Sequence, residues 1–303
     1  MKILFTGLPY FTSRFVDQLN SFDQKNTYVF CDTYSSKFAQ FKFLFHLFSA
    51  RVVVSFNGVT SNSGSLNWAI KFKKKIILQW HGTDVLNVSK NRANNIFKDE
   101  YLNNSLSFTD ASWLQEELKK ENIECSILQF KTIETAKKKK HFPSNNVLTY
   151  VAKGRETFYG INKVLKLATK YPQLIFNVIG TDGDKLEFPE NVKFYGWVGK
   201  KRAEELRNEC PIFIRLTEHD GYALSVLEAL SNGNYVLWNN PHSQCYFAEY
   251  DEDIEETFDQ ILIDLKQNNR KRIEANIDWC LQNLDETTVL QNYISKLEEI
   301  ARK

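Results

Sequence analysis

The amino-acid sequence predicts an α/β protein of two domains, each built on a parallel β-sheet. Short apolar runs of strand length alternate with segments of helical periodicity along most of the 303 residues. A polar, basic, proline-bearing stretch at 137–146 interrupts this alternation, which then restarts. We therefore expect an N-terminal domain over 1–140 and a C-terminal domain over 141–275. Helices over 276–303 would follow and could pack back on the first domain.

The elements of the first half follow from this pattern in order. An apolar strand at 3–6 is broken by Gly7, and a helix is expected over 12–19, which is how a doubly wound domain begins. Further strands are expected at 28–31, 51–56, 75–79 and 106–109, with helices at 65–72 and 111–120.

The second half repeats the alternation. Strands are expected at 147–151, 174–179, 192–195, 212–215 and 235–238, with helices at 162–170, 201–208 and 224–231, and a nearly all-helical tail from about 254. Ligands of open parallel sheets bind beyond the carboxyl ends of the strands. We expect the loops that face a ligand to be those after Thr6, Phe56, Gln79, Val151, Ile179 and Arg215.

Composition narrows the class of protein. Hydrophobic residues make up 43% and charged residues 25%, and the net charge is +2, so no overall field attracts nucleic acid and no nucleic-acid partner is expected. The five cysteines are scattered without a CxxC pair, which favours a reduced, cytoplasmic protein. The N-terminus lacks the pattern of a signal peptide, and no apolar run is long enough for a transmembrane helix.

The segment 214–238 carries the strongest chemical signal. A strand ends near Arg215, a loop contains Asp220, and Glu228 lies eight positions later on a helix. The free N–H groups at the start of that helix suit a diphosphate. Asp220 could accept hydrogen bonds from sugar hydroxyls, and Glu228 could hold a ribose diol. The alternative is an ordinary strand, loop and helix with Asp220 as a capping residue.

This segment resembles the signature of glycosyltransferase family 4 and its relatives of the GT-B fold, in which two Rossmann-like domains face each other across a cleft. The family pattern is Glu-Gly-Phe-Gly-Leu, three residues and Glu, where this chain has Asp first and Ala at the second Gly. The resemblance implies that Asp220 contacts the donor sugar and that Glu228 binds the ribose. The residues between them would offer backbone to the diphosphate, namely Gly221, Tyr222, Ala223 and Leu224.

Two further segments resemble the family. The stretch 191–211 is similar to the strand, Gly-Trp turn and short helix upstream of the signature, and Gly180-Thr181 is similar to a glycine loop over the nucleotide. Arg155 matches an arginine that clamps the diphosphate, a role that suits a bidentate guanidinium. Where the family commonly has a second cation, this chain has Tyr159. Either Tyr159 donates a hydrogen bond there, or Lys153 or Lys163 replaces the missing lysine.

In the first half the resemblance points to the acceptor side. His81 stands at the end of a strand, where the family has a histidine close to the reacting sugar, and Asp84 would anchor its loop or touch the acceptor. Gly7 resembles the family's N-terminal glycine loop without its tandem glycines. Asn57, followed by Gly58, is a candidate acceptor loop, although a surface turn is the favoured interpretation.

The resemblance implies a retaining glycosyltransferase that moves a sugar from a UDP- or GDP-linked donor to a glycan or lipid-linked acceptor, without metal or cofactor. Assembly of bacterial surface polysaccharide or other glycans is the expected setting. The alternatives are a nucleotide-sugar epimerase on the same fold and a non-catalytic relative that binds nucleotide sugar. The sequence does not indicate an oligomeric state.

Two charged or aromatic segments have alternative interpretations. The acidic triplet 251–253 could hold a metal, but acids that complement a helix start are preferred. The aromatic segment 38–48, with basic runs at 73–75 and 137–140, could lie on the inner face of an anionic membrane. A buried helix with solvated lysines is the favoured interpretation of that segment.

Overall fold

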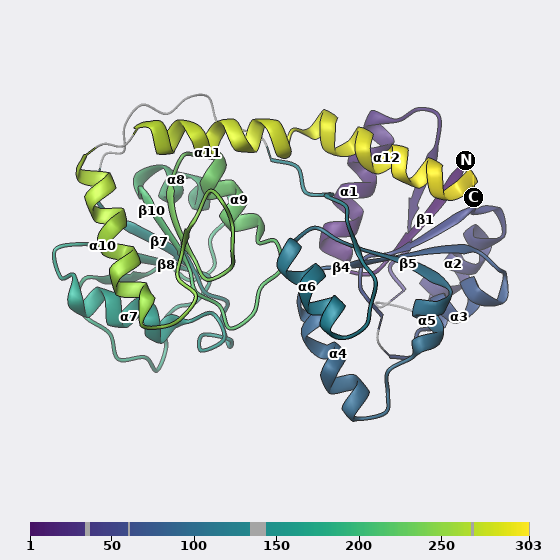
Figure 1. The fold of residues 1–303 in the computed structure, drawn as a ribbon, viewed down its shortest axis with the longest axis horizontal. Coiled ribbons are helices and arrows are strands. Elements are labelled where there is room, and N and C mark those ends of the chain that lie inside the picture. The colour runs from purple at the N-terminus through teal and green to yellow at the C-terminus, as the bar shows by residue number, and fades with distance from the viewer. Residues whose placement is uncertain (34–36, 60, 134–143, 268–269, 303) are drawn as a thin grey trace. The chain divides into compact units, whose positions relative to one another are not determined.

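The computed structural model describes residues 1–33, 37–59, 61–133, 144–267 and 270–302. The chain forms two compact units (Figure 1). Unit 1 comprises 1–132 together with 286–303, and unit 2 comprises 133–285. Most of the expected linker at 137–146, including the basic run 137–140, lies outside the described residues.

Unit 1 contains a sheet of six parallel strands in the order β2-β1-β3-β4-β5-β6. These strands are β1 (Lys2–Thr6), β2 (Thr27–Phe30), β3 (Val52–Ser55), β4 (Lys75–Trp80), β5 (Ser105–Thr109) and β6 (Ser126–Ile127). Its helices are α1 (Pro9–Phe22), α2 (Lys37–Ser49), α3 (Gly64–Lys71), α4 (Thr83–Ala93), α5 (Asp99–Asn103), α6 (Ser112–Lys120) and α12 (Glu286–Arg302).

The last helix completes the core of unit 1. Its residues Leu290, Tyr293 and Leu297 are buried in the same cluster as the apolar side chains of β1 and β3. The ring of Tyr293 stands edge-on to Phe15 of α1, with 4.8 Å between ring centroids. Figure 1 shows α12 in yellow beside α1 in purple, so the two ends of the chain share one core.

Unit 2 contains a second parallel sheet of six strands, in the order β12-β11-β10-β7-β8-β9. These strands are β7 (Val147–Tyr150), β8 (Phe176–Ile179), β9 (Val192–Phe194), β10 (Ile212–Arg215), β11 (Tyr235–Trp238) and β12 (Tyr246–Phe247). Its helices are α7 (Ile161–Lys170), α8 (Lys200–Glu209), α9 (Leu224–Ser231), α10 (Asp253–Lys266) and α11 (Arg270–Asn283).

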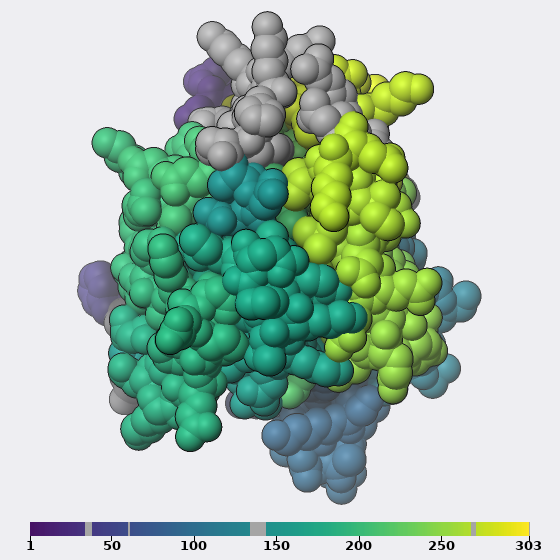
Figure 2. Space-filling view, turned by 90° about the vertical axis from the view of Figure 1, so that its left-hand side faces the viewer, coloured from purple at the N-terminus to yellow at the C-terminus, as the bar shows by residue number. Residues whose placement is uncertain are grey.

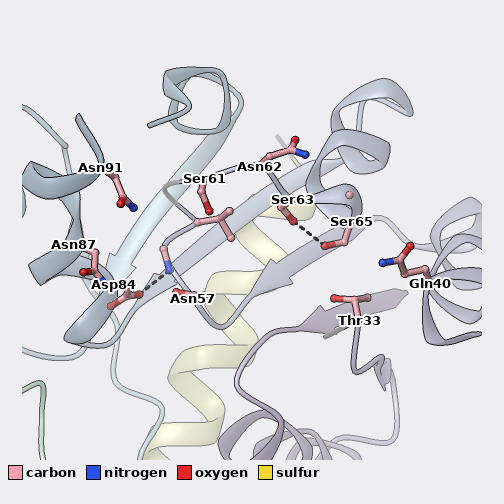
Figure 3. Close-up of a pocket in the computed structure, with 13 residues that line it drawn as sticks. Thr33, Gln40, Asn57, Ser61, Asn62, Ser63, Ser65, Asp84, Asn87 and Asn91 are labelled. Carbon is pink, nitrogen blue, oxygen red and sulfur yellow. Dashed lines mark hydrogen bonds between the residues drawn. The ribbon is translucent and has the colours of Figure 1, made fainter. Parts of the chain in front are cut away.

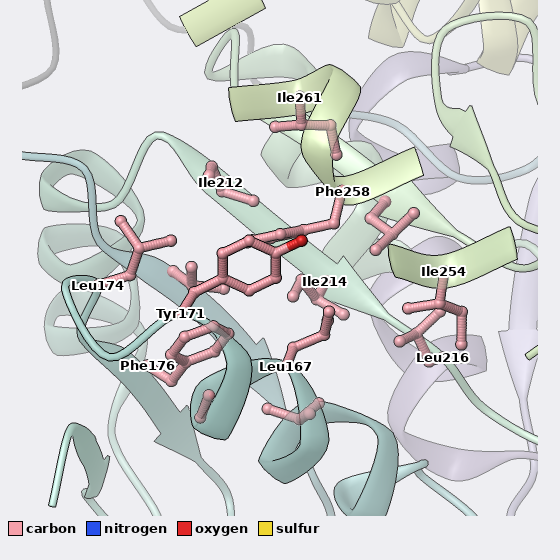
Figure 4. Close-up of a cluster of buried hydrophobic side chains, with 14 of the residues drawn as sticks. Leu167, Tyr171, Leu174, Phe176, Ile212, Ile214, Leu216, Ile254, Phe258 and Ile261 are labelled. Atoms are coloured by element: carbon pink, nitrogen blue, oxygen red, sulfur yellow. The ribbon is translucent and has the colours of Figure 1, made fainter. Parts of the chain in front are cut away.

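Helices α7 and α10 cover one face of this sheet. Phe258 of α10 packs between Tyr171 and Phe176, with ring centroids 4.9 and 6.2 Å away (Figure 4). At the surface α7 and α10 lie side by side, as Figure 2 shows in teal-green and yellow-green, and Lys166 and Lys170 of α7 pair there with Glu255. The predicted α/β class, two parallel sheets and helical tail are confirmed.

The strand orders locate a switch point in each sheet. In unit 2 the chain leaves β7 toward β8 and leaves β10 toward β11 in the opposite direction, although β7 and β10 are neighbours. In unit 1 the same reversal occurs between β1 and β3. The loops that follow two such strands diverge at their carboxyl ends and leave room for a ligand. These two edges are therefore the first places to look for a site.

One expectation about unit 1 is wrong. The aromatic segment 38–48 is helical, as α2, but it is not a buried helix. Phe43 and Leu47 are buried, whereas Phe38, Phe41, Phe45 and Phe48 are exposed. Because the helix is aromatic on two faces, only one of them can pack on the sheet.

Candidate functional site

The loops after β7 and β10 are in contact at the switch point of unit 2. The backbone N–H of Glu218 donates to the Phe158 carbonyl at 2.8 Å. Gly160 has φ +70°, and a Cβ on it would lie 2.1 Å from the Leu216 carbonyl oxygen. Only glycine fits this close approach and this left-handed backbone. Gly160 therefore lets the two loops form one continuous edge.

Arg215 and Asp220 form a buried ion pair at this edge. The guanidinium of Arg215 donates from Nε to Asp220 Oδ2 at 2.7 Å and from Nη2 to Oδ1 at 3.2 Å. The two side chains are only 9% and 12% exposed. Asp220 is thus held in a fixed orientation and does not act as the helix cap of the alternative interpretation. A carboxylate offers about four lone pairs, and the two hydrogen bonds from Arg215 use two of them.

Arg215 also lies beside Tyr159, which stands where the family that the sequence resembles commonly has a lysine. Its guanidinium carbon lies 4.8 Å from the ring centroid of Tyr159. A buried guanidinium, paired with Asp220, therefore stands beside Tyr159. No role for Arg215 was predicted from the sequence. The available signal was a charged residue ending an otherwise apolar strand, IFIR.

Both lysines proposed as replacements, Lys153 and Lys163, form ion pairs with acidic side chains. Lys153 forms an ion pair with Asp182, and its Nζ is 3.6 Å from Asp184. Lys163 pairs with Asp251 at 2.7 Å. Both contacts are surface ion pairs, which hold a side chain only weakly.

Arg155 is exposed on the loop after β7 and is orientated by aromatic rings. Its guanidinium carbon lies 4.1 Å from the ring centroid of Phe158 and 5.8 Å from that of Tyr159. Within the described part of the chain no carboxylate pairs with Arg155. An exposed guanidinium that is stacked but not neutralised is well suited to an anionic ligand.

Helix α9 begins without a side-chain cap. Its N-cap residue is Ala223, and no side chain among the described residues accepts a hydrogen bond from its first turn. Free N–H groups therefore remain at Leu224 and the residues next to it, as an anion would require. Glu228 lies along this helix, and its carboxylate accepts from Arg207 Nη2. A ribose bound by Glu228 would share that carboxylate with Arg207.

Tyr222 connects the loop that resembles the family signature to a partly buried histidine. Its hydroxyl lies 3.1 Å from His242 Nε2, and the His242 ring packs edge-on against Trp279 at 4.6 Å. Burial, followed by the charge of Arg272, lowers the pKa of His242 to about 4. The imidazole is therefore neutral near pH 7 and holds the Tyr222 side chain without adding charge to the edge.

The glycine loop after β8 is also built into the edge. Gly180 has φ +98°, and a Cβ there would lie 2.5 Å from the Val151 carbonyl oxygen. Thr181 is buried, and its hydroxyl donates to Glu156 Oε1 at 2.7 Å. This bond lowers the pKa of Glu156. Thr181 therefore orders the loop that carries Arg155.

In unit 1 a polar pocket of about 400 Å³ opens beyond β3 and β4 (Figure 3). Amides and hydroxyls dominate its lining, and among the described lining residues Asp84 is the one acid and none is basic or aromatic. The lining residues are Thr33, Gln40, Asn57, Gly58, Val59, Ser61, Asn62, Ser63, Gly64, Ser65, Asp84, Asn87 and Asn91. Asn57 is thus part of a pocket wall. Gly58 is buried against the ring of Trp80, which does not fit the surface turn that the sequence favoured.

Asp84 fixes the inner end of this pocket. Its carboxylate accepts from the backbone N–H groups of Gly58 at 2.7 Å, Gly82 at 2.8 Å and Val85 at 3.0 Å, and from that of His81 at 3.0 and 3.2 Å. Burial raises the pKa of Asp84, and the four backbone donors oppose that rise. The residue predicted as a loop anchor thus ties the loops after β3 and β4 together.

His81 does not line the pocket. Its ring packs against Phe56 and Phe130 with centroids 5.2 and 5.0 Å away. Its Nε2 is buried and has no hydrogen-bond partner among the described residues. Burial and then the charge of Lys131 hold its pKa well below the ordinary value. His81 is therefore a neutral imidazole with an unused polar atom.

Near His81 there is also a buried ion pair, Lys131–Asp110, that was not predicted from the sequence. Lys131 Nζ lies 2.6 Å from Asp110 Oδ2, and the two side chains are almost fully buried. Asp110 follows β5 directly, so it stands at the same carboxyl edge as His81. Its position immediately after an apolar strand was the available signal.

Gly7 makes a tight turn after β1. Its φ is +87°, and a Cβ would lie 2.8 Å from the Phe56 carbonyl oxygen. This contact joins the loops after β1 and β3. Leu8 and Pro9 then start α1, whose N-cap has no side-chain hydrogen bond. An acceptor role for Gly7 stays a prediction.

The acidic triplet 251–253 is accounted for by local contacts. Asp251 pairs with Lys163, and Asp253 accepts from the backbone N–H of Tyr250 at 3.1 Å in the first turn of α10. Within the described ranges, no three His, Cys, Asp or Glu side chains are grouped as a metal site needs.

No protein-family model and no curated protein sequence matches the chain. Solved structures do match. A glycosyltransferase from Rickettsia africae is 11% identical with a TM-score of 0.71, over 100% of this chain and 99% of that one. The pneumococcal O-GlcNAc transferase GtfA, in complex with UDP and GlcNAc, is 11% identical with a TM-score of 0.59, over 83% of this chain. This chain spans only 57% of the length of GtfA.

An epimerase also has this fold. A putative UDP-N-acetylglucosamine 2-epimerase from Listeria monocytogenes is 10% identical with a TM-score of 0.55, over 98% of this chain and 96% of that one. At such low identity the likenesses concern the fold. The chain therefore has the GT-B fold that the sequence predicted.

Proposed function

We propose that this protein is a retaining glycosyltransferase that uses a nucleotide-diphosphate sugar. The edge at the switch point of unit 2 carries the proposal. There Arg155, the uncapped start of α9 and the Arg215–Asp220 pair lie on loops that touch one another. This set combines a cation and free N–H groups for a diphosphate with a carboxylate for sugar hydroxyls.

The leaving diphosphate would be stabilised by fixed groups. Arg155 and the backbone of Tyr222, Ala223 and Leu224 would take up the negative charge that develops on it. Arg215, beside the Tyr159 ring, would support this charge less than an unpaired lysine does, because Asp220 is its counter-charge. The proposed route to retention, which the family resemblance implies, is front-face attack through an oxocarbenium-like state without a metal.

The acceptor is proposed to be a carbohydrate bound in the pocket of unit 1. Amides and hydroxyls pair with sugar hydroxyls in both donor and acceptor directions. A volume of about 400 Å³ lies within the usual range of small-ligand sites. Because Asp84 already accepts four backbone hydrogen bonds, the pocket favours an uncharged saccharide over a cationic or anionic acceptor. Bacterial glycan assembly, with the glycan free or lipid-linked, is the setting we propose.

Nucleotide binding provides the first test. Isothermal titration should show UDP or GDP binding, and Arg155→Ala should weaken it about tenfold to a hundredfold, because charge-assisted hydrogen bonds contribute about 1.5–3 kcal/mol. Arg202→Ala is the matched control, since Arg202 lies in the same unit but pairs with Glu205 on α8. If neither nucleotide binds, or if both variants behave alike, the proposed donor site is wrong.

A donor screen then separates the rival activities. Neutral saccharides are offered as acceptors, and the anomer of the product is determined by NMR. Retention with a neutral acceptor supports the proposal, whereas inversion contradicts it. The similarity to the Listeria epimerase keeps one alternative open: sugar inversion within the nucleotide sugar with no acceptor present. Binding without turnover of any donor would identify a non-catalytic relative.

A further inference from the structure

An aromatic patch lies exposed on α2 and α3. On α2, Phe38, Phe41, Phe45 and Phe48 are between 67% and 80% exposed. Their spacing of three, four and three residues places them on one stripe of the helix. On α3 and just after it, Trp68 and Phe72 are 38% and 37% exposed. We call these six side chains the aromatic patch.

Contacts between the two helices make the patch continuous. The rings of Phe48 and Phe72 are 5.0 Å apart, and Phe72 stacks on Trp68 at 6.0 Å. Lys74 Nζ donates to the carbonyls of Phe48 at 3.1 Å and Ala50 at 2.8 Å, which fixes the end of α2 to the segment after α3. Figure 1 shows α2 and α3 as neighbours in unit 1.

The charges of the segment that carries the patch have a single sign. Seven of the 39 basic residues and none of the 37 acidic residues fall between Thr33 and Thr83, although the whole chain is only +2. The rest of the chain, with 32 basic and 37 acidic residues, is therefore net acidic. Lys42, Lys71 and Lys73 are exposed beside the aromatic rings, and Lys71 Nζ lies 4.8 Å from the Trp68 ring centroid.

We propose that the aromatic patch docks on the surface of an anionic lipid bilayer. The phenylalanine rings would enter the boundary between headgroups and acyl chains, and Lys42, Lys71 and Lys73 would face the headgroup phosphates. A bilayer fits better than a protein partner because the six rings include one polar atom among them, an indole N–H, so directed contacts with a defined partner are few. None of the described helices has the length and apolarity to cross a bilayer. The proposed docking is peripheral: the protein binds at the surface of the bilayer without crossing it. This proposal is independent of the proposed function.

Vesicle flotation tests the aromatic half of the proposal. The full chain should float with vesicles of phosphatidylcholine and phosphatidylglycerol and should bind pure phosphatidylcholine much less. Phe41→Ser with Phe45→Ser should weaken binding about a hundredfold, because burying each ring contributes about a factor of ten or more. Trp197→Ser is the matched control, since Trp197 is an 82% exposed aromatic residue in unit 2.

Charge reversal tests the basic half. Lys71→Glu with Lys73→Glu should weaken binding to anionic vesicles by at least about fivefold for each charge removed. Lys200→Glu with Lys201→Glu reverses two exposed lysines of unit 2 and should leave binding unchanged. All of the substituted side chains are exposed, and circular dichroism of each variant checks that it is folded.

Three outcomes would overturn the proposal. The first is failure of the wild-type chain to bind anionic vesicles. The second is equal binding by the patch variants and their controls. The third is a concentration-dependent dimer that Phe41→Ser with Phe45→Ser dissolves while vesicles do not bind, since this would identify the occupant as a second copy of the chain.

Discussion

Substitution of Asp220 by Ala should leave a guanidinium buried without its counter-charge. The two hydrogen bonds from Arg215 are 2.7 and 3.2 Å long, and neither side chain is more than 12% exposed. Truncating one partner of such a pair costs about 3–5 kcal/mol. Because the Tyr159 ring 4.8 Å away offers Arg215 a partial cation–π substitute, we expect the lower end, about 3 kcal/mol.

Removing both charges should restore stability. The free energy of unfolding of the Arg215→Met, Asp220→Leu double variant should lie within about 1 kcal/mol of that of the wild type, because no unpaired charge remains. Turnover should stay lost in the double variant if Asp220 contacts the sugar. Comparing the two variants separates support of the fold by Asp220 from its proposed role toward the donor.

Urea denaturation with hydrogen exchange of peptides from β10 and β11 is the suitable measurement, since the two units need not unfold together. Donor turnover is measured on the same preparations. If the free energy of unfolding of Asp220→Ala lies within about 1 kcal/mol of the wild-type value, the ion pair does not stabilise the fold as predicted. An active double variant would refute the role of Asp220 toward the sugar.

Two further predictions concern the same edge of unit 2. The pKa of His242 in the folded protein, about 4, lies below the ordinary histidine pKa of 6.5. The contribution of His242 to stability is therefore full above about pH 6.5 and is lost as the pH falls toward 4. The urea stability advantage of the wild type over His242→Gln should therefore shrink by about 2 kcal/mol between pH 7 and about pH 5, and a constant advantage would contradict the assignment. Gly160→Ala should cost about 3 kcal/mol in urea denaturation, from the left-handed backbone and the 2.1 Å contact with Leu216. Gly154→Ala, at φ +78° with nothing within 4 Å, should cost only about 1 kcal/mol, and equal losses would show that the contact does not matter.

The fold was predictable because the central strands of its two sheets are buried on both faces. Strands of this kind appear in a sequence as apolar runs such as VVVS and IFIR, separated by helical periodicity. The edge strands β6 and β12 have two residues each and produce no such run. They were therefore not predicted.

The surface of α2 could not be predicted from its composition. A helix that is aromatic on two faces satisfies the pattern of a buried helix, and nothing in the sequence states how many faces the neighbouring elements cover. Phe43 and Leu47 fill the space against the sheet, and no described element covers the stripe of Phe41 and Phe45. Exposure is therefore a property of the assembled unit.

The signature predicts which residues bind the donor but not the partners of those residues in the structure. The spacing of Asp220 and Glu228 pointed to a nucleotide-sugar site, yet both acids are paired with arginines that the pattern does not contain. Arg207 lies 21 positions from Glu228, on another helix. Contacts of this length follow only from the packing of α8 against α9 and their strands.

Because unit 1 is built from two separate segments of the chain, the two units can complete their folding at different stages of synthesis. Residues 133–285 emerge from the ribosome as a contiguous segment and can fold during translation, whereas unit 1 lacks α12 until its last residues have been made. Until then Phe15 and its neighbours face solvent in place of Tyr293. Thr132 and Glu286 are the points where the chain leaves and re-enters unit 1. Gln18 joins these two points, because its Nε2 donates to Thr132 at 2.8 Å and to Glu286 at 3.0 Å. The N-terminal part of unit 1 is thus made before unit 2, yet its core is completed only after unit 2 has been made.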